Sequence, residues 1–297
     1  MLRDMFQGVY TAMVTPFKDG KIDYESFEKL VELQITAGID GIVPLGTTGE
    51  SPTVSFEEHK EFVKHTVKIV NGRVKVIAGT GANSTDEAIH LSKRAQDDGV
   101  DAVLQVNPYY NKPTQAGLIA HFEKIAKSIK IPVMLYNIPG RTGVNFLPES
   151  VNELLKRVDN IASMKEASGD INQMMELIAL AGDKISVVSG DDNLTLPLLA
   201  VGGKGVVSVV SNLIPGDVVS VVKLYNEGKT EEAKEKFYKI LPLCRAIFYE
   251  TNPIPIKCAM EMLGHCSGEL RLPMVEISPA NKERLKKALI EYGVKLK

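Results

Sequence analysis

The feature of this sequence that most constrains its fold is an alternation of short apolar runs with amphipathic stretches. Strand-like runs recur about every 20 to 35 residues, and eight of them can be counted. Several are apolar at consecutive positions, a pattern typical of strands that are buried on both faces of a parallel sheet. The runs are Gly8–Phe17, Gly41–Gly46, Lys75–Gly81, Ala102–Pro108, Pro132–Pro139, Ile161–Ala167, Ile185–Gly190 and Gly205–Ser211.

The intervals between the runs predict helices. Ile119, Phe122, Ala126 and Ile129 follow the spacing of one helix face. Capping residues mark where helices begin, because a serine or threonine side chain can satisfy an orphan backbone N–H group. We expect capping boxes at Ser55–Glu58 and Ser84–Glu87, and N-caps at Thr114, Thr230 and Ser278.

Eight strand–helix units predict a (β/α)8 TIM barrel over residues 1–225. An open, doubly wound sheet is the rival, and we prefer closure because no dinucleotide fingerprint follows the first strand. Residues 226–297 predict a C-terminal helical region, with helices at Thr230–Tyr249, Pro255–Leu263 and Pro279–Tyr292 and no strand between them. This tail has too little core to stand alone, so we expect it to pack on the barrel or on another subunit.

Charge and composition exclude several classes of function. A net charge of -2 provides no basic field for nucleic acid. The most apolar stretch, Val206 to Val222, is interrupted by Asn212 and Pro215, so we expect no membrane span, and the N-terminus has no apolar signal core. Three cysteines without a Cys-x-x-Cys pair predict free thiols in the cytoplasm. None of the five histidines falls at a strand end, so we expect no metal.

Lys165 is the first candidate catalytic residue, because it lies inside the apolar run Ile161–Ala167. Desolvation lowers the pKa of a lysine and makes its amine a nucleophile toward carbonyl groups. Taken by itself, the run also fits a surface lysine on a half-exposed strand. Tyr136 lies in the preceding run, and neighbouring strands are about 4.8 Å apart. The two side chains can therefore meet if both point inward, which the sequence does not decide.

Two further elements at predicted strand ends suit anionic substrates. The turn Gly46–Glu50 contains Thr47 and Thr48, whose backbone N–H groups and hydroxyls could bind a carboxylate, although a plain tight turn reads the same way. Arg141 follows the fifth run in a loop that contains proline and glycine, where a guanidinium could hold a carboxylate by two hydrogen bonds or form a surface ion pair.

With these residues in order, the chain resembles the dihydrodipicolinate synthase family within the pyruvate-dependent class I aldolase superfamily. The resemblance covers nearly the whole chain, including the tail. It implies that Lys165 forms an imine with pyruvate without any cofactor, and that Thr47 and Thr48 hold the pyruvate carboxylate. It further implies a proton relay of Thr48, Tyr136 and Tyr110. Arg141 would bind aspartate-4-semialdehyde, the second substrate, and the product would enter lysine and diaminopimelate biosynthesis.

The resemblance also implies an assembly and a regulatory site. It predicts a homotetramer built from two dimers, in which Tyr110 reaches the neighbouring subunit, and it places Gly190 and Val207 at the pyruvate end of the site. Positions that match an allosteric lysine site are Ser51, His59, Asn83, Glu87 and Tyr109. Phe56 and Pro52 depart from the pattern of lysine-sensitive members, so inhibition by lysine stays open.

Two other functions compete with this interpretation. One is another pyruvate-dependent lyase, such as N-acetylneuraminate lyase or a 2-keto-3-deoxy sugar acid aldolase, which would share Lys165 and Tyr136 but would not usually carry Arg141 in this context. The other is a non-catalytic barrel that binds a small metabolite. Trapping of a pyruvate imine with borohydride separates the second from the enzymes, and parallel substrate assays separate the first.

Overall fold

The computed structural model describes residues 2–297 and shows a closed, parallel barrel that confirms the predicted fold class. Adjacent strands pair in chain order, and the pairing of Gly8 with Gly205 closes the ring. Across the described residues the barrel strands are β1 (Gly8–Ala12), β4 (Gly41–Val43), β5 (Lys75–Gly79), β6 (Ala102–Val106), β7 (Val133–Asn137), β8 (Ile161–Glu166), β9 (Ser186–Ser189) and β10 (Gly205–Ser208).

The predicted strands lie where expected, but most of them are shorter than predicted at their C-terminal ends. The largest difference is in the first run, where β1 ends at Ala12 and a separate hairpin, β2 (Phe17–Lys18) with β3 (Lys21–Ile22), follows. Residues that read as strand ends are therefore loop residues at the mouth of the barrel. In barrels of this kind the mouth at the C-terminal ends of the strands is where active sites form.

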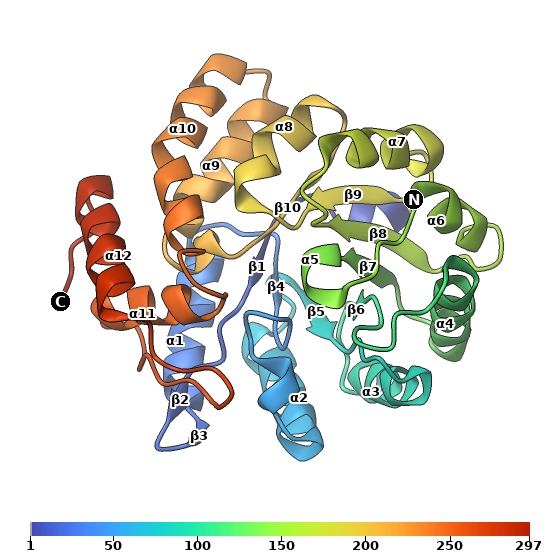
Figure 1. Ribbon diagram of the computed structural model, residues 1–297, viewed down its shortest axis with the longest axis horizontal. Helices are drawn as coiled ribbons and strands as arrows, with labels where there is room; N and C mark the ends of the chain where they lie inside the picture. The colour runs from blue at the N-terminus through green and yellow to red at the C-terminus, as the bar shows by residue number, and fades with distance from the viewer. Residues whose placement is uncertain (1) are drawn as a thin grey trace.

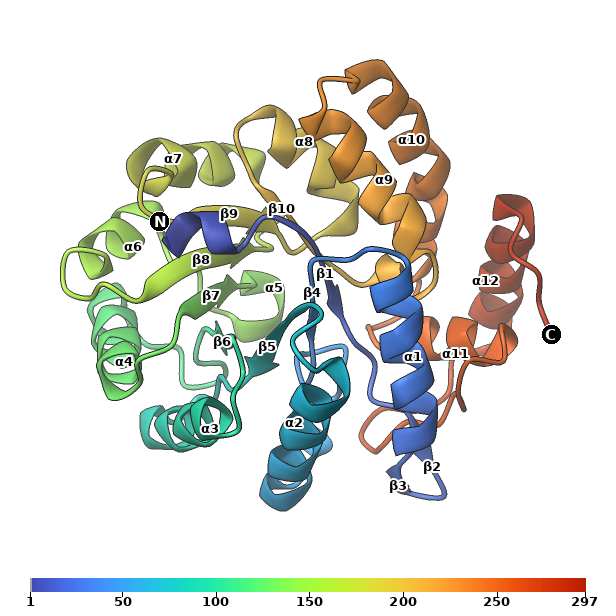
Figure 2. The ribbon, with the colours of Figure 1, turned by 180° about the vertical axis from the view of Figure 1, so that it is seen from behind.

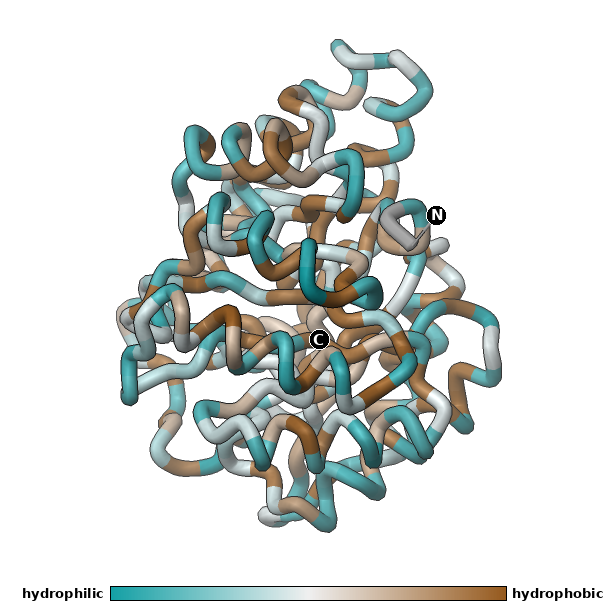
Figure 3. The backbone as a smooth tube through the Cα atoms, turned by 90° about the vertical axis from the view of Figure 1, so that its right-hand side faces the viewer, coloured by the Kyte–Doolittle hydropathy of each residue, from teal (hydrophilic) through white to brown (hydrophobic). Residues whose placement is uncertain are grey.

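Helices surround the barrel, as Figures 1 and 2 show. Those that follow successive barrel strands are α1 (Tyr24–Thr36), α2 (Phe56–Val70), α3 (Thr85–Asp97), α4 (Gln115–Ser128), α5 (Pro139–Thr142), α6 (Pro148–Leu154), α7 (Ile171–Ala181), α8 (Thr195–Ala200) and α9 (Pro215–Asn226). In Figure 3 the peripheral helices alternate between hydrophilic and hydrophobic segments along their length. This alternation is expected of helices that bury one face against a sheet.

The predicted helix caps are partly confirmed. Ser55 and Glu58 form a complete capping box, with both reciprocal hydrogen bonds, and Thr114 accepts a hydrogen bond from the backbone of Gly117. Ser84 accepts from the backbone N–H of Glu87. No reciprocal bond from the Glu87 side chain is found among the described residues, so this site is a simple N-cap rather than a capping box.

The two predicted caps in the tail have different outcomes: Thr230 is corrected, and Ser278 is confirmed in position but caps no backbone group with its side chain. Thr230 is the first residue of its helix, and Lys229 occupies the N-cap position without a side-chain capping bond. Ser278 does occupy the N-cap position, with Pro279 after it, but its hydroxyl donates to the carboxylate of Glu250 instead of capping the helix. The Glu250 carboxylate, which lies outside this helix, therefore binds the hydroxyl that would otherwise cap the helix.

The C-terminal tail consists of α10 (Thr230–Ala246), α11 (Ile254–Met262) and α12 (Pro279–Tyr292). Figure 1 shows these helices together on one side of the barrel, next to α1 and α9. One hydrophobic core runs through barrel and tail and includes Ile256, Leu285 and Leu289 of the tail. Such a shared core is what a tail too small to fold alone requires. The division at residue 225 stays a prediction.

The two mouths of the barrel are covered differently. The short helix α5 lies at the front of the barrel in Figure 1, and the 3-10 helix η1 (Leu2–Met5) crosses the opposite end in Figure 2. Because α5 directly follows β7, it marks the mouth that contains the C-terminal ends of the strands. No helix among residues 2–297 is both long enough and apolar enough to cross a membrane.

Candidate active site

Lys165 and Tyr136 lie side by side within the barrel wall. Tyr136 of β7 pairs in register with Lys165 of β8, and both side chains are buried. The Lys165 Nζ atom lies 4.2 Å from the centre of the Tyr136 ring. The closed barrel therefore answers the question of orientation that the sequence left open. The surface-lysine alternative is wrong for this chain, since only 5% of Lys165 is exposed.

The environment of Lys165 favours its neutral form. The pKa of Lys165 is lowered to about 8, mainly by burial; Asp191 and Asp192 oppose the shift, and the Arg141 guanidinium adds to it. The balance reflects the cost of burying an ammonium group with only partial compensation by negative charge. A larger fraction of the amine is thus unprotonated, and nucleophilic, near neutral pH than for an exposed lysine.

Asp191 and Asp192 form a pair of adjacent carboxylates just after β9. The structure places both carboxylates close enough to influence Lys165. Asp192 begins a 3-10 helix and accepts hydrogen bonds from the Ser208 hydroxyl and from the backbone N–H groups of Val209 and Val210. Burial raises the pKa of Asp191 to about 6, and Lys165 opposes that rise.

The two residues predicted at the pyruvate end differ in what the structure shows. A methyl group added at Gly190 would lie 2.6 Å from the Cβ atom of Ala167 and 3.1 Å from the Cε atom of Lys165. Glycine at this position therefore leaves room for the lysine side chain. Val207 is fully buried in β10 and pairs in register with Tyr10 of β1.

The turn after β4 has the features of an anion-binding site. Its own hydrogen bonds use the N–H groups of Gly49, Glu50 and Ser51. The backbone N–H groups of Thr47 and Thr48 donate to no protein acceptor among residues 2–297, so they are available to a bound carboxylate.

Two non-glycine residues in left-handed conformations bracket this turn. Leu45 has φ 54° and Glu50 has φ 53°. Such conformations cost on the order of 1–3 kcal/mol each and persist only where the surrounding structure holds them. The turn is held partly by the Thr15 hydroxyl, which donates to the Gly49 carbonyl at 2.7 Å.

The pairing of Thr48 with Tyr136 in a proton relay stays a prediction. The threonine whose side chain interacts with the Tyr136 phenol, and so lowers its pKa, is Thr47. Burial raises the pKa of Tyr136 to about 12, while Arg141 and this interaction oppose the rise. The Thr48 hydroxyl instead accepts a hydrogen bond from the side-chain amide of Asn252 at 3.0 Å. Adjacent residues of a turn point in different directions, and the sequence could not say which one faces the phenol.

Arg141 lies in the one-turn helix α5 rather than in the predicted loop. Its Nη2 atom donates to the backbone carbonyl of Asn252 at 3.0 Å. Asn252, from the segment before α11, thus contacts both Thr48 and Arg141. Sequence reasoning missed Asn252, because nothing local in the tail indicates that it reaches the barrel mouth.

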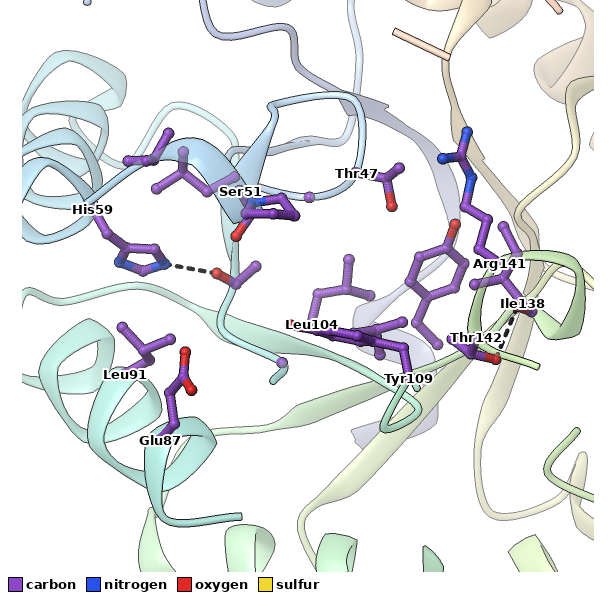
Figure 4. A pocket seen from close by; sticks show the side chains of 18 of the residues that line it. Thr47, Ser51, His59, Glu87, Leu91, Leu104, Tyr109, Ile138, Arg141 and Thr142 are labelled. Carbon is purple, nitrogen blue, oxygen red and sulfur yellow. Dashed lines mark hydrogen bonds between the residues drawn. The ribbon is translucent and has the colours of Figure 1, made fainter. Parts of the chain in front are cut away.

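A cavity of about 440 Å³ opens beside these residues. In Figure 4, His59, Leu91 and Glu87 lie at one end of it, and Arg141 and Thr142 lie at the other. Tyr136 and Thr47 line the cavity, whereas Lys165 does not line it and lies against the Tyr136 ring. A substrate that reached Lys165 from this cavity would therefore pass the phenol and the turn that carries Thr47.

Four of the five positions that match a lysine site line the same cavity. They are Ser51, His59, Glu87 and Tyr109. The His59 Nε2 atom is hydrogen bonded to the Gly79 carbonyl at 2.8 Å, and burial lowers the pKa of His59. Asn83 donates to the Tyr109 carbonyl at 3.2 Å. Glu87 is thus the carboxylate at the end of the cavity that His59 lines.

Tyr110 does not join the buried residues around Lys165. Its side chain is 91% exposed, and its backbone has φ 73°. The loop is pinned beside it, because Asn111 donates to the Asn83 carbonyl at 2.9 Å. Within one chain, the Tyr110 side chain is therefore exposed to solvent rather than packed beside Lys165. Among residues 2–297, no group of three or more His, Cys, Asp or Glu side chains is arranged to hold a metal ion.

Comparison with known proteins assigns a family to this geometry. The sequence profile of the dihydrodipicolinate synthetase family matches residues 5–292. A relative from Leptospira biflexa, named 4-hydroxy-tetrahydrodipicolinate synthase, is 57% identical over 288 residues, which cover 97% of this chain and 98% of the relative. The solved 4-hydroxy-tetrahydrodipicolinate synthase of Methylacidiphilum fumariolicum SolV superposes with a TM-score of 0.96 at 50% identity, covering 97% of this chain and 96% of that one.

Two further solved structures bear on ligands and assembly. The dihydrodipicolinate synthase of Acinetobacter baumannii, described as complexed with pyruvate, has a TM-score of 0.95 at 42% identity, with 97% of this chain and 99% of that chain covered. Another, described as a monomeric dihydrodipicolinate synthase variant, has a TM-score of 0.96 at 44% identity and covers 98% of each chain.

Proposed function

The chain belongs to the dihydrodipicolinate synthetase family of lyases, and we propose that it condenses pyruvate with L-aspartate-4-semialdehyde through an imine on Lys165. The product is 4-hydroxy-tetrahydrodipicolinate, in the biosynthesis of lysine and diaminopimelate. The observation that carries the role of Lys165 is a buried amine with a pKa of about 8 beside a phenol. The free thiols Cys244, Cys258 and Cys266 fit a cytoplasmic location.

The first half of the reaction uses Lys165 as nucleophile. Its neutral amine adds to the ketone carbon of pyruvate, and the resulting carbinolamine loses water to give the protonated imine. Water leaves only after its oxygen is protonated, and Tyr136 is the acid within reach of that oxygen. The Thr47 hydroxyl, hydrogen bonded to Tyr136, orients the phenol. The backbone N–H groups of Thr47 and Thr48 bind the pyruvate carboxylate.

The second half forms the carbon–carbon bond. The imine draws electrons from the methyl group of pyruvate, which loses a proton to give an enamine, and no metal or other cofactor is required. The enamine carbon attacks the aldehyde carbon, whose oxygen takes up a proton. The amino group of the second substrate then attacks the imine carbon and expels the Lys165 amine as the ring closes. Arg141 binds the carboxylate of this second substrate at the cavity mouth.

We also propose that the working enzyme is a homotetramer of two dimers, in which Tyr110 of one subunit completes the relay of its neighbour. The support is a tyrosine that is 91% exposed and held in a left-handed conformation on a pinned loop. Phe56 and Tyr109, which line the cavity and are also exposed, provide further apolar surface. Since a related variant is described as monomeric, the assembly of this chain needs its own measurement.

Borohydride trapping tests the proposal. Purified protein treated with pyruvate and borohydride should gain the mass of one reduced pyruvate adduct, and peptide mapping should place it on Lys165. Lys165→Met should stay unlabelled, whereas Lys184→Met, on the surface, should label like the wild type. An unlabelled wild type would favour the non-catalytic barrel. Parallel assays with aspartate-4-semialdehyde, sialic acid and 2-keto-3-deoxy sugar acids then decide among the lyases.

A further inference from the structure

Glu50 immediately follows the carboxylate-binding turn and is almost completely buried. Its Oε1 atom accepts a hydrogen bond from Lys257 Nζ at 2.6 Å, and its Oε2 atom accepts one from the backbone N–H of Arg271 at 3.1 Å. Both partners belong to the C-terminal tail, more than 200 residues further along the chain. The turn is thus joined to the tail through one carboxylate.

Lys257 is fully enclosed by the fold. Its side chain on α11 has no exposed surface, and its Nζ atom also donates to the Glu269 carbonyl at 2.6 Å. The same atom lies 4.1 Å from the centre of the Phe17 ring, which follows β1. A buried ion pair contributes little net stability compared with apolar residues of the same volume. Its presence here therefore suggests a role other than stability.

The left-handed backbone of Glu50 connects this pair to the turn. A non-glycine residue leaves that conformation readily unless its surroundings hold it, and a change of φ at Glu50 would rotate the peptide groups that precede it. Those peptide groups include the free N–H groups of Thr47 and Thr48. The same tail also holds the Thr48 hydroxyl through Asn252.

We propose that the Glu50–Lys257 ion pair holds the turn in the conformation that binds the carboxylate of pyruvate, which makes Lys257 a positioning residue for imine formation. This inference rests on the proposed function, because it assumes that the turn binds pyruvate. It assigns the tail a part in substrate binding, although Lys257 lies outside the cavity and never touches the substrate.

Neutralising the pair in two steps tests the inference. Lys257→Met leaves Glu50 buried without a counterion, and Glu50→Gln does the same to Lys257, so both variants should melt at lower temperature than the wild type. The double variant, Glu50→Gln with Lys257→Met, buries no unpaired charge and should recover most of the melting temperature. Lys287→Met, which removes an exposed ion pair on α12, is the matched control.

The discriminating measurement is kcat/KM for each substrate. We expect kcat/KM for pyruvate to fall about tenfold in Lys257→Met and to stay low in the double variant, because a misplaced binding group slows the step it serves. The same ratio for aspartate-4-semialdehyde should fall less than about threefold, since Arg141 keeps its own anchor at Asn252. Recovery of the pyruvate ratio together with the melting temperature would show a purely structural pair and overturn the proposal.

Two additions keep the test decisive. Glu50→Asp retains the charge but shortens the side chain by one methylene, so it should keep the fold while reducing kcat/KM for pyruvate. Wild-type values in both Glu50→Asp and the double variant would also refute the positioning role. Borohydride trapping of the wild type is the control for the underlying function. An unlabelled wild type would remove the proposed function, whereas a labelled wild type with unaffected variants would remove only this inference.

Discussion

At the scale of single residues, the chemistry of this protein depends on an amine that the fold keeps partly neutral. Burial lowers the pKa of Lys165 to about 8, and the two carboxylates after β9 limit the fall. Two requirements therefore limit how far the pKa of this amine can fall. It must be neutral to attack a ketone, and it must not become so weak a base that the imine nitrogen fails to hold a proton. Asp191 and Asp192 are the groups that set this balance.

The pH dependence of imine formation follows from this balance. Because only the neutral amine attacks pyruvate, kcat/KM for pyruvate should rise with pH and level off above an apparent pKa near 8. Asp191→Asn removes a charge that raises the pKa of Lys165, so the profile should move to lower pH. Initial rates between pH 6 and pH 10, at subsaturating pyruvate, measure both curves. Asp97→Asn, on the exposed surface of α3, should leave the profile in place, and an unmoved profile in Asp191→Asn would contradict the assignment.

Arg141 should separate the two halves of the reaction. Arg141→Ala removes the guanidinium that lines the cavity without touching Lys165 directly, so borohydride should still trap the pyruvate adduct. Use of the semialdehyde should fall by about 100-fold or more in kcat/KM, because a charge-assisted pair with the carboxylate is lost. Steady-state kinetics with each substrate varied in turn makes the comparison. An equal loss of both half-reactions would mean that Arg141 has been misassigned.

At the scale of elements, the site is made where strand ends meet a turn and the tail. The register of β7 with β8 puts Tyr136 beside Lys165. The strained turn after β4 brings Thr47 to the phenol, and Asn252 connects that turn to Arg141. None of these contacts is local in sequence. Each depends on the closure of the barrel or on the packing of α11 against its mouth.

A substitution at Gly79 tests how closely the turn after β4 packs against β5. A methyl group added at Gly79 of β5 would lie 2.0 Å from the Leu45 carbonyl oxygen, so the turn would have to move. Gly79→Ala should destabilise the protein by roughly 1–3 kcal/mol, as overpacking does elsewhere, and should lower kcat/KM for pyruvate. Gly216→Ala in α9, where the added methyl meets open space, is the matched control and should neither destabilise the protein nor lower kcat/KM. Denaturant unfolding and steady-state rates provide the two readouts.

The ion pair between Glu58 of α2 and Arg271 of the tail predicts that the stability of the fold is sensitive to acid. Arg271 donates to both oxygens of Glu58 and lowers the pKa of that carboxyl to about 2. A depressed carboxyl pKa contributes stability that is fully present above about pH 4.5 and is lost as the pH falls toward 2. Glu58→Gln should therefore flatten the dependence of the melting temperature on pH within that window. A parallel curve for wild type and variant would show that Glu58 contributes nothing to it. Glu25→Gln, at an exposed ion pair on α1, serves as control.

At the scale of the whole molecule, the C-terminal tail packs on the barrel and also contacts its mouth. The tail shares the core with the barrel and provides Asn252 and Lys257 to the mouth. One face of the mouth nevertheless carries Tyr110, which is almost fully exposed in the part of the chain that the structure describes. An assembly that buries this face would account for its apolar side chains.

Mixed assemblies test the proposed exchange of Tyr110. Tyr110→Phe alone should slow turnover, because the hydroxyl is lost from every site. Lys165→Met alone should be inactive. When the two variants are unfolded together and refolded as mixed oligomers, activity should exceed that of either parent, since some sites receive an intact lysine and an intact tyrosine from different chains. Analytical ultracentrifugation establishes the assembly in the same samples. Activity of the mixture equal to the average of the parents would argue against exchange.

The proposed effector site for lysine would lie in the cavity at the barrel mouth. Glu87 lies at the far end of the cavity and could accept an ammonium group, which supports a proposed effector site there. Millimolar lysine should reduce the initial rate if that site is used, and Glu87→Gln should weaken the effect. Ser84 still caps α3 in that variant, because the capping bond uses the backbone N–H of residue 87. Rates that are insensitive to lysine in the wild type would remove the effector site from consideration.

What the sequence determined alone is whatever depends on neighbours along the chain. Eight apolar runs with helical intervals predicted the barrel, and the capping box at Ser55 predicted the start of α2, because period and capping are local properties. Lys165, Tyr136, Thr47 and Arg141 could be selected as candidates because their residue types stand at strand ends.

The tertiary structure alone decided which of these groups meet. It turned Lys165 inward, brought Thr47 to the phenol, and carried Asn252 and Lys257 of the tail to the turn after β4. The face of a strand on which a side chain lies, and the contacts between residues about 200 positions apart, are fixed when the ring of strands closes and buries a common core. No short stretch of the chain contains that information, since it arises only when distant segments exclude water together.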